Sequence, residues 1–450
     1  MMTVKEIISL TNGRLIHGDL KQKSSGVSTD SRTIKKNNLF IALKGKRFDG
    51  HKFLLSVARK NIKVVLVSKK PEKKYSNISV ILVKDTSFAL QDLARSHREN
   101  FQIPVIAITG SCGKTTTKEL IASVLSKKLC VLKNFSTENN FIGVSKTILE
   151  LKSKHDVLIL EFGTNHFGEI KNLVNIANPT ICVLTNVGKS HLEFLKTSAG
   201  VFKEKKGIYA NLEKSGTIIF NRDDEFLSKI FKEKTLAQKL TFSINQKSNI
   251  QALKIQRMPK GIHFFVGKQK FFVNSFSYSG VYNALCAISV GTLFNFPKKT
   301  MALALLKARL PGQRQSLCFT KKKFWIIDDS YNANPLSVKF ALESLCYLPT
   351  KRKRIFVFGG MGELGRSSSQ AHKDIGHLID KNKVDYFITI GKNARLAIKA
   401  VGQRHISTLS FDSCKPALTF LKSFVCAGDS VLIKGSRSFH LEEIVSQLKK

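Results

Sequence analysis

The segment from residue 107 to 118 has the composition of a loop that binds the phosphates of a nucleotide. It reads Ala-Ile-Thr-Gly-Ser-Cys-Gly-Lys-Thr-Thr-Thr-Lys and follows directly on an apolar run. Phosphate oxygens need several N–H donors at close range, which favours glycine where a side chain would block the backbone, here Gly110 and Gly113. Lys114 can bring positive charge to the terminal phosphates, and Thr115 can offer a hydroxyl to Mg²⁺. The segment therefore predicts a site for ATP and Mg²⁺, and its expected nucleotide-binding residues are Gly110, Ser111, Cys112, Gly113, Lys114, Thr115 and Thr116.

This loop differs from the general phosphate-loop pattern in its length. Only Ser111 and Cys112 separate its glycines, where the general pattern has four residues. A glycine turn before an ordinary helix is the alternative, but it does not explain Gly-Lys-Thr-Thr behind an apolar strand. Cys112 lies near the expected start of that helix, whose positive end favours a thiolate. We expect Cys112 to react with alkylating agents and bound ATP to slow that reaction.

The elements that must position the loop are short apolar runs that alternate with helical spacing. A helix is expected over 118–128, and a β-rich stretch over 240–275 is followed by a helix over 281–294. This alternation predicts a parallel sheet covered on both faces. The expected strands of this sheet are 105–108, 157–160, 181–184 and 217–220.

The segments before and after the expected central sheet also alternate apolar strands with helices. Strands are expected at 39–43, 64–67 and 80–83 before the sheet, with a helix over 87–100, and at 324–327, 355–358, 386–390 and 431–433 after it. A chain of 450 residues exceeds one core, since domains usually hold roughly 100 to 200 residues. We predict an α/β chain of three domains: a small α/β domain over 1–100, a central P-loop ATPase domain with a parallel sheet over 101–311, and a doubly wound, Rossmann-like domain over 312–450.

Composition limits the class of protein. Hydrophobic residues make up 42% and charged residues 24%, which is ordinary globular usage. We find neither a secretory leader nor an apolar run of membrane-spanning length, and the eight cysteines have no zinc-site spacing. We expect a reduced cytoplasmic protein, and a monomer.

The net charge of +42 is extreme, but the basic residues occur in short clusters along the whole chain. We interpret most of them as solvated surface residues. The ligands that we expect this positive charge to attract specifically are anionic nucleotide substrates. Contact with an anionic membrane surface stays open, whereas specific nucleic-acid binding is not expected. A nucleic-acid-binding protein would instead show tight, salt-sensitive binding of duplex DNA.

The form Thr-Gly-Ser-Cys-Gly-Lys-Thr-Thr-Thr-Lys-Glu resembles the ATP loop of the Mur ligases and of their relatives, the folylpolyglutamate synthases and cyanophycin synthetases. The segments 28–32, 38–43 and 48–51 look like the uridine-nucleotide domain of Mur ligases, which folylpolyglutamate synthases lack. Within the family, the chain is most similar to the ligases that add D-alanyl-D-alanine, and it lacks the Asp-Asn-Pro-Arg sequence of those that add diaminopimelate. The segments that carry this similarity are 137–144, 161–170, 185–193, 328–337, 360–365 and 434–437.

The resemblance implies an ATP-dependent, ADP-forming amide-bond ligase of peptidoglycan synthesis. It would join D-alanyl-D-alanine to UDP-N-acetylmuramoyl-tripeptide through an acyl phosphate. The residues that match catalytic positions are Lys114, Glu161, His191 and Lys205, and those that match Mg²⁺ contacts are Thr115, Glu161, His191 and Lys205. The residues that match adenine, phosphate and ribose contacts are Asn283, Arg314 and Asp329, respectively. The residues that match contacts to the other substrates are Ser28, Asp30, Ser31, Arg32, Asn139, Asn140, Asn332 and Asn334.

Several of these residues have simpler interpretations. Glu161 could be a carboxylate exposed at the end of a strand, and His191 could be a structural hydrogen-bonding group, because Mg²⁺ prefers oxygen ligands. Mur ligases carry a carbamylated lysine, usually in a Lys-Gly-Glu-Ile motif. This chain has Lys205-Lys206-Gly207-Ile208 instead, so either lysine could be the modified one, or the cluster could be solvated. Asn283, Arg314 and Asp329 could be a helix cap, a surface charge and a solvated strand end. For the whole chain the rivals are another Mur-type amino-acid ligase and a P-loop ATP-binding protein without ligase activity.

Overall fold

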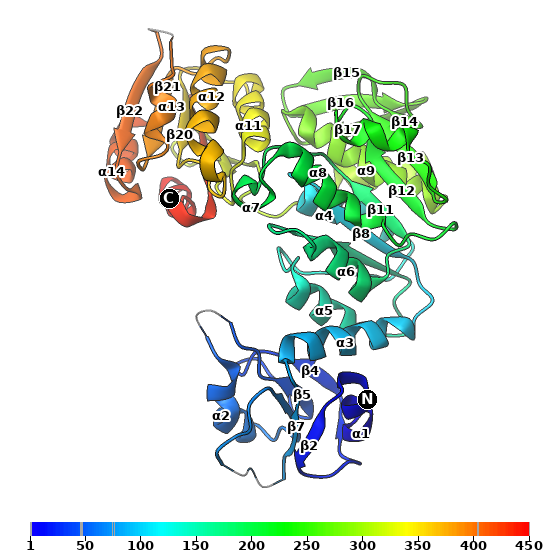
Figure 1. Cartoon of the computed structure of the whole chain (residues 1–450). Coiled ribbons are helices and arrows are strands. Elements are labelled where there is room, and N and C mark those ends of the chain that lie inside the picture. The colour runs from blue at the N-terminus through cyan, green and yellow to red at the C-terminus, as the bar shows by residue number, and fades with distance from the viewer. Residues whose placement is uncertain (1, 46–47, 74, 76, 403–404, 450) are drawn as a thin grey trace. The chain divides into compact units, whose positions relative to one another are not determined.

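The computed structural model describes residues 2–45, 48–73, 75, 77–402 and 405–449 of the chain (Figure 1). By internal contacts the chain divides into two compact units, which we describe separately. The first comprises Met1–Ile106, Cys130–Gly163 and Glu169–Pro179, and the second comprises Ala107–Leu129, Thr164–Gly168 and Thr180–Lys450.

The N-terminal part of the first unit is built on a five-stranded sheet of order β2-β7-β6-β5-β4, in which only β2 is antiparallel to its neighbour. Leu39 and Ile41 of β5 enter one hydrophobic cluster, while Phe40 enters another. Successive side chains of a strand point to opposite faces, so both faces of this sheet are covered, and the predicted small α/β domain is confirmed. The elements are α1 (Val4–Thr11), β2 (Arg14–His17), β4 (Gly26–Ser28), β5 (Asn38–Ile41), α2 (Leu54–Ala58), β6 (Val64–Val67), β7 (Ser79–Leu82) and α3 (Thr86–Glu99).

A seven-stranded sheet of order β14-β13-β12-β11-β8-β10-β9 contains the strand that leads into the phosphate loop. Its strands are β8 (Val105–Thr109), β9 (Val131–Lys133), β10 (Val157–Glu161), β11 (Ile181–Leu184), β12 (Thr217–Asn221), β13 (Gln238–Ser243) and β14 (Ile250–Gln251). The pairings of β9 with β10 and from β11 through β14 are parallel, which agrees with the prediction. β8, β10 and β11 are buried along their whole length, because a parallel sheet is covered on both faces.

The helices and the remaining strands of this region complete the frame around the loop. The main helices are α4 (Lys114–Leu125), α5 (Phe141–Leu149), α6 (Glu169–Ala177), α8 (Ser198–Lys206), α9 (Tyr278–Leu293) and α10 (Lys298–Leu306). α4 begins at Lys114 rather than at the expected residue 118, because Gly113 caps it in a left-handed conformation. The β-rich stretch is confirmed as β13, β14 and the antiparallel sheet β15 (Leu253–Met258), β16 (Gly261–Val266) and β17 (Gln269–Val273).

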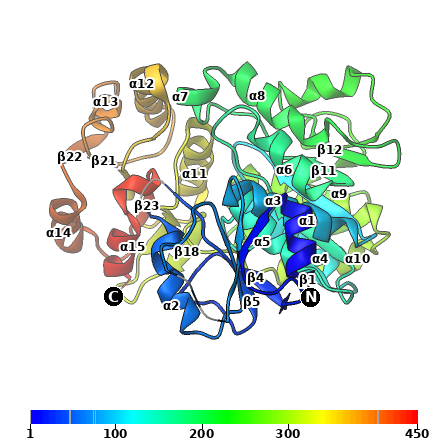
Figure 2. The same cartoon turned by 60° about the horizontal axis from the view of Figure 1, so that its bottom comes forward.

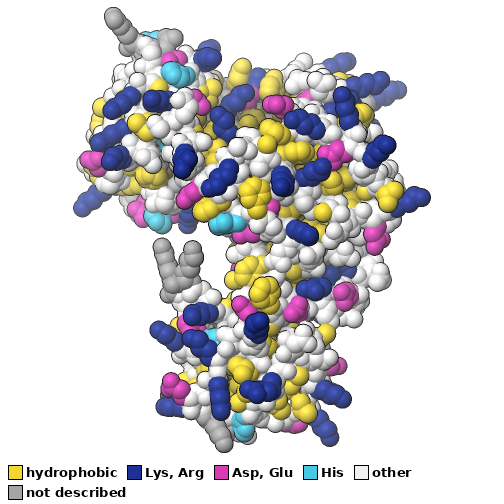
Figure 3. All heavy atoms as spheres, viewed as in Figure 1, with side chains coloured by type: hydrophobic (Ala, Val, Ile, Leu, Met, Phe, Trp, Pro, Cys, Tyr) yellow, Lys and Arg dark blue, Asp and Glu magenta, His cyan; other side chains and the backbone are white. Residues whose placement is uncertain are grey.

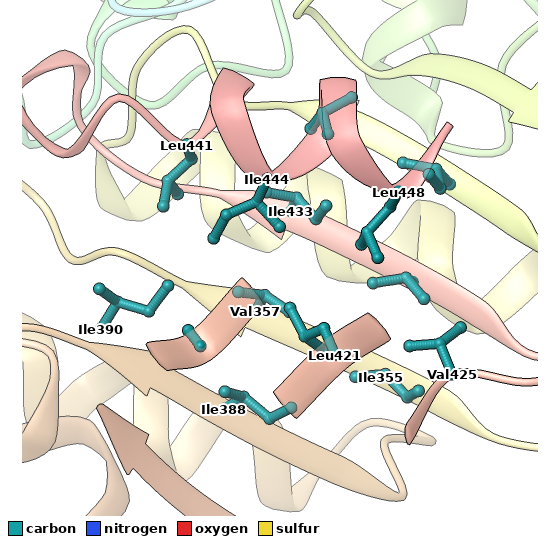
Figure 4. Packing of buried hydrophobic residues seen from close by; sticks show 14 of the residues in the cluster. Ile355, Val357, Ile388, Ile390, Leu421, Val425, Ile433, Leu441, Ile444 and Leu448 are labelled. Carbon is teal, nitrogen blue, oxygen red and sulfur yellow. The ribbon is translucent and has the colours of Figure 1, made fainter. Parts of the chain in front are cut away.

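The C-terminal part of the second unit is a six-stranded sheet of order β18-β19-β23-β20-β21-β22, parallel except for β18. In β20 (Arg354–Phe358), Ile355 and Val357 enter a core with side chains of α14 and α15 (Figure 4), while Phe356 and Phe358 pack against Phe387 on the opposite face. The helices α14 and α15 contact each other (Figure 2). Helices on both faces give the predicted Rossmann-like arrangement. The other elements are β18 (Ser316–Phe319), β19 (Trp325–Asp329), α11 (Pro335–Tyr347), α12 (Ser368–Asp380), β21 (Tyr386–Ile390), α13 (Arg395–Ile398), β22 (Ser407–Phe411), α14 (Cys414–Phe424), β23 (Ser430–Lys434) and α15 (Glu442–Leu448).

The surface agrees with the interpretation of the charge. Lysine and arginine side chains are scattered over the visible face and do not form one stripe (Figure 3). Among the described helices, none has the length and apolar character required to cross a membrane.

Candidate active site

The phosphate loop runs from the end of β8 to the start of α4, and its two glycines are required by close contacts. Gly113 has φ +80°, and a Cβ atom on it would lie 2.4 Å from Oδ1 of Asn283. A Cβ atom on Gly110 would lie 1.9 Å from Oγ1 of Thr185. Asn283 lies on α9, and its Oδ1 accepts a hydrogen bond of 3.2 Å from Oγ1 of Thr117 in α4. The amide of Asn283 therefore packs under the loop and is not simply a helix cap.

Asn186, which follows β11, holds the middle of the loop. Its Oδ1 accepts a hydrogen bond of 2.9 Å from the backbone N–H of Cys112, and its Nδ2 donates one of 3.1 Å to the carbonyl of the same residue. Its own carbonyl accepts from the backbone N–H of Ser111 at 3.0 Å. No role was predicted for Asn186. The available signal was a polar Thr-Asn pair directly after a buried strand.

Ser111 joins the loop to two other segments. Its hydroxyl donates to the carbonyl of Gly188 at 3.1 Å and accepts from the hydroxyl of Ser190 at 3.0 Å. Its carbonyl accepts a hydrogen bond of 3.2 Å from Nδ2 of Asn334, whose Oδ1 also caps α11 through the N–H of Ser337. Asn334, predicted to contact substrate, thus lies against the phosphate loop.

The first residues of α4 place a cation and a hydroxyl beside the loop. Nζ of Lys114 donates to the carbonyl of Gly110 at 2.8 Å, and Thr115 is buried. The first turn of an α-helix presents backbone N–H groups and the positive end of the helix dipole, which suit phosphate oxygens. Two glycines without room for a Cβ, a lysine and a buried threonine fit a nucleoside triphosphate with Mg²⁺.

Cys112 corrects one expectation. Burial raises the pKa of the Cys112 thiol to about 11, although the charge of Lys114 and the hydrogen bond with Asn186 act in the opposite direction. The expected stabilisation of a thiolate by the helix end is therefore wrong, because desolvation of the anion outweighs the nearby positive charge.

The two candidate lysines at the end of α8 have different environments. Lys205 is buried, and burial together with the charge of Lys114 holds its pKa well below the usual value. Its neighbour Glu204 accepts hydrogen bonds from Oγ1 of Thr164 at 3.2 Å and from the N–H of Gly168 at 2.7 Å. By contrast, the side chain of Lys206 is 41% exposed and forms an ion pair of 2.9 Å with Glu233. Burial therefore favours the neutral form of the Lys205 amine, whereas Lys206 lies at the surface in an ion pair.

Glu161, at the end of β10, is only 1% exposed, so the alternative of a solvent-exposed carboxylate is wrong. Its Oε1 accepts a hydrogen bond of 2.8 Å from Nδ2 of Asn139, and its backbone N–H donates to Oδ1 of Asn134 at 2.9 Å. Asn140 caps α5 through the N–H of Gly143. Both predicted asparagines therefore have structural partners within the first unit, and one of them orients the Glu161 carboxylate.

His191, which follows β11, adopts a left-handed backbone conformation with φ +53° and caps the short helix α7 (Leu192–Leu195). Its Nδ1 lies 2.5 Å from Oε2 of Glu363, a residue for which no role was predicted. Within the described part of the chain, no three or more His, Cys, Asp or Glu side chains cluster as a ready metal site. The predicted Mg²⁺ contacts have a different chemistry, since they include a hydroxyl and a modified lysine.

Asp329, Asn332 and Arg314 gather around β19 and β23. Nζ of Lys434 donates to Oδ2 of Asp329 at 2.6 Å and to the carbonyl of Asn332 at 2.9 Å. Asp329 is therefore a buried ion-pair partner, and the alternative of a solvated strand end is wrong. The guanidinium of Arg314 lies 4.2 Å from the ring centroid of Tyr331.

The predicted uridine-nucleotide residues form a turn after β4. Ser28 Oγ accepts from the N–H of Asp30, and the Asp30 carboxylate binds the guanidinium of Arg32 at 2.7 Å. Hydrogen bonding from the Arg32 side chain lowers the pKa of Asp30 to about 2. The carbonyl of Ser31 accepts from Nζ of Lys60 at 2.8 Å. Arg32 keeps 85% of its side chain exposed and is accessible to an anionic substrate.

The predicted residues belong to two units. In the second unit, Asn283 and Asn334 form hydrogen bonds with the phosphate loop or with α4, and the charge of Lys114 acts on Lys205. His191, Arg314, Asp329 and Asn332 also belong to the second unit. The predicted residues of the first unit are Glu161 at the end of β10, Asn139 and Asn140 after β9, and the turn from Ser28 to Arg32.

Comparison with known proteins gives matches along nearly the whole chain. Three family models match: the Mur ligase family catalytic domain at residues 23–98, the Mur ligase middle domain at 108–291, and the Mur ligase glutamate ligase domain at 314–437. The UDP-N-acetylmuramoyl-tripeptide--D-alanyl-D-alanine ligase of Bacillus subtilis is 34% identical over 99% of this chain and 98% of its own. Among solved structures, a MurF from Acinetobacter baumannii has a TM-score of 0.91 and 29% identity, covering 99% and 98% of the two chains. A MurF ligase from Thermotoga maritima, solved in complex with ADP, has a TM-score of 0.83 and 25% identity over 96% and 98%.

Proposed function

Since this chain belongs to the Mur ligase family, we propose that it joins D-alanyl-D-alanine to UDP-N-acetylmuramoyl-tripeptide at the expense of ATP. The carboxylate of the tripeptide becomes reactive when it accepts the terminal phosphoryl group of ATP, which yields an acyl phosphate and ADP. The free amine of the dipeptide then attacks the acyl carbon, phosphate leaves, and the UDP-linked pentapeptide of peptidoglycan synthesis is formed. The observation that carries this proposal is the phosphate loop at the end of β8, in a chain similar over its whole length to ligases of this activity.

The chain contributes mainly position and charge to such a reaction, because phosphoryl transfer needs little covalent chemistry from the protein. The loop from Gly110 to Thr116 holds the phosphates with backbone N–H groups, and Lys114 compensates the charge of the terminal phosphate. We assign the adenine, phosphate and ribose contacts to Asn283, Arg314 and Asp329. Asn283 is supported by its position under Gly113.

Magnesium, when bound, neutralises charge on the phosphates. The side chains that we assign to it are Thr115, Glu161, His191 and a carbamylated Lys205. Carbon dioxide reacts only with a neutral amine, and the burial of Lys205, which lowers its pKa, favours that form. The resulting carbamate is an anion with carboxylate-like oxygens, which a divalent cation prefers to an amine.

The remaining assignments concern the other substrates and the organisation of the chain. The turn from Ser28 to Arg32 receives the uridine nucleotide, Asn139 and Asn140 lie at the acceptor peptide, and Asn332 and Asn334 lie at the dipeptide. We assign domain ranges of 1–100, 101–311 and 312–450 to these roles. We also propose that the chain is a cytoplasmic monomer.

The test is release of phosphate by the purified full-length chain with ATP and Mg²⁺, combined with mass spectrometry of the product. Phosphate release should require both UDP-N-acetylmuramoyl-tripeptide and D-alanyl-D-alanine, and the product should be the pentapeptide. Control reactions omit each substrate in turn, or replace the dipeptide by diaminopimelate and the tripeptide by the shorter dipeptidyl precursor. Stimulation by diaminopimelate would identify another amino-acid ligase of the family. ATP hydrolysis that ignores every uridine nucleotide would contradict ligase activity altogether.

A further inference from the structure

The carboxylate of Glu363, in the loop after β20, contacts the imidazole of His191, and backbone contacts between the two loops support this pair. Oε2 of Glu363 lies 2.5 Å from Nδ1 of His191, 172 positions earlier in the chain. The carbonyl of Glu363 also accepts a hydrogen bond of 3.0 Å from the N–H of Glu193. Gly365 packs so closely that a Cβ atom on it would lie 2.9 Å from Cα of Glu193. The two loops therefore fit each other through backbone as well as side chains.

Both partners adopt an unusual backbone conformation. His191 has φ +53° and Glu363 has φ +58°, in the left-handed region that residues with a side chain rarely occupy. Such conformations persist where the surroundings fix them, and they concentrate at functional sites. The backbone of both loops therefore fixes the positions of His191 and Glu363, and the contact does not depend on the two side chains alone.

The contact determines which nitrogen of His191 is available. An imidazole that donates its Nδ1–H to a carboxylate keeps the lone pair of Nε2 for another partner. Among the described residues, none forms a hydrogen bond with Nε2 of His191. Histidines that bind metals usually have this arrangement, in which a carboxylate orients the ring and increases its basicity.

We propose that Glu363 is a positioning residue that orients His191 so that Nε2 can bind the divalent cation of the nucleotide site. This inference rests on the metal-binding role proposed above for His191. The competing interpretation is a surface ion pair that affects folding slightly and cation binding not at all, since the side chain of Glu363 is 46% exposed.

The experiment measures binding of Mn²⁺, as a substitute for Mg²⁺, to the full-length protein with saturating ADP, by electron paramagnetic resonance of the free ion. Glu363→Ala should weaken Mn²⁺ binding by roughly 10-fold to 100-fold, the usual effect of losing a carboxylate behind a metal-bound histidine. Glu363→Gln should retain part of the affinity, because its amide oxygen can still accept the Nδ1–H. In the His191→Ala background, Glu363→Ala should cause no further loss.

The matched control is Asp412→Ala, which removes an exposed carboxylate that also lies 2.5 Å from its cationic partner, Arg395. It should leave Mn²⁺ binding unchanged. Wild-type affinity in Glu363→Ala, or an equal loss with and without His191, would overturn the inference. Glu363→Gln gives the same decision if the alanine variant does not fold. Product formation by the wild type is measured separately, so that failure of the ligase assay refutes the proposed function, whereas an intact ligase with a silent Glu363 refutes only this inference.

Discussion

Replacing Gly113 by alanine tests whether the phosphate loop requires a residue without a Cβ atom at this position. The φ of +80° costs an L-residue about 1 to 2 kcal/mol. The new Cβ would lie 2.4 Å from Oδ1 of Asn283, so the amide must move and lose its hydrogen bond from Thr117, which costs about 1 kcal/mol more. We therefore expect a total destabilisation of about 2 to 3 kcal/mol. The affinity for ATP should also fall, because Gly113 is the N-cap residue of α4, whose first turn offers N–H groups to the phosphates.

Two other glycines separate these contributions. Gly168 has φ +88°, and no atom lies within 4 Å of the position that a Cβ would occupy, so Gly168→Ala should show only the backbone cost of about 1 to 2 kcal/mol. Gly312 has neither a positive φ nor a close neighbour, so Gly312→Ala should change stability by less than about 1 kcal/mol. The assay is the opening free energy of residues 105–125 from hydrogen exchange, together with ATP affinity from calorimetry. For Gly168 and Gly312 the exchange is read at their own peptides.

The ranking of the three variants by loss of stability tests this explanation. If Gly113→Ala destabilises its segment no more than Gly168→Ala does, the contact with Asn283 does not constrain the loop. If ATP affinity is unchanged in Gly113→Ala, the loop is not the phosphate site.

Lys205→Ala should lose most ligase activity, and small carboxylic acids should restore part of it, whereas Lys206→Ala should lose little activity. Full activity in Lys205→Ala with loss of activity in Lys206→Ala would assign the carbamate to Lys206. Cys112 should be alkylated far more slowly than exposed Cys130 at pH 7, since a pKa of about 11 leaves roughly one thiol in ten thousand ionised. Raising the pH towards 11 should accelerate that labelling and saturating MgATP should slow it, as peptide mass spectrometry can show. Labelling equal to that of Cys130 at pH 7 would contradict the raised pKa of Cys112. Lys114→Ala should reduce product formation by roughly 100-fold or more, because charge in the transition state goes uncompensated, and wild-type turnover would refute its role.

The parts of the fold that are predictable from the sequence are those in which one physical signal dominates. β8 and β20 are apolar on both faces because they lie inside parallel sheets, so their runs are unmistakable. The edge strands β9 and β22 give no such signal: β9 has three residues, and β22 reads Ser-Thr-Leu-Ser-Phe and is exposed or half-buried along its length. Propensity does not identify such strands, since their pairing depends on the neighbour in the sheet.

The site shows the same limit. Gly110, Gly113 and Lys114 are contiguous, so their joint chemistry can be predicted from the sequence alone. Asn186 and Glu363 act on residues 74 and 172 positions away, and only the fold brings these partners together. The distinction between Lys205 and Lys206 likewise depends on burial, which neighbouring identical letters do not reveal.

The amide of Asn186 acts on the loop as a neighbouring strand would, because it satisfies both the donor and the acceptor of one peptide position, Cys112. Fixing the backbone of a residue costs about 1 to 2 kcal/mol in conformational entropy, so ordering the stretch from Gly110 to Gly113 costs several kcal/mol. In this chain that cost is met when the protein folds, since Asn186 belongs to the strand end and not to the nucleotide. The binding energy of ATP is then available for the reaction instead of for building its own site.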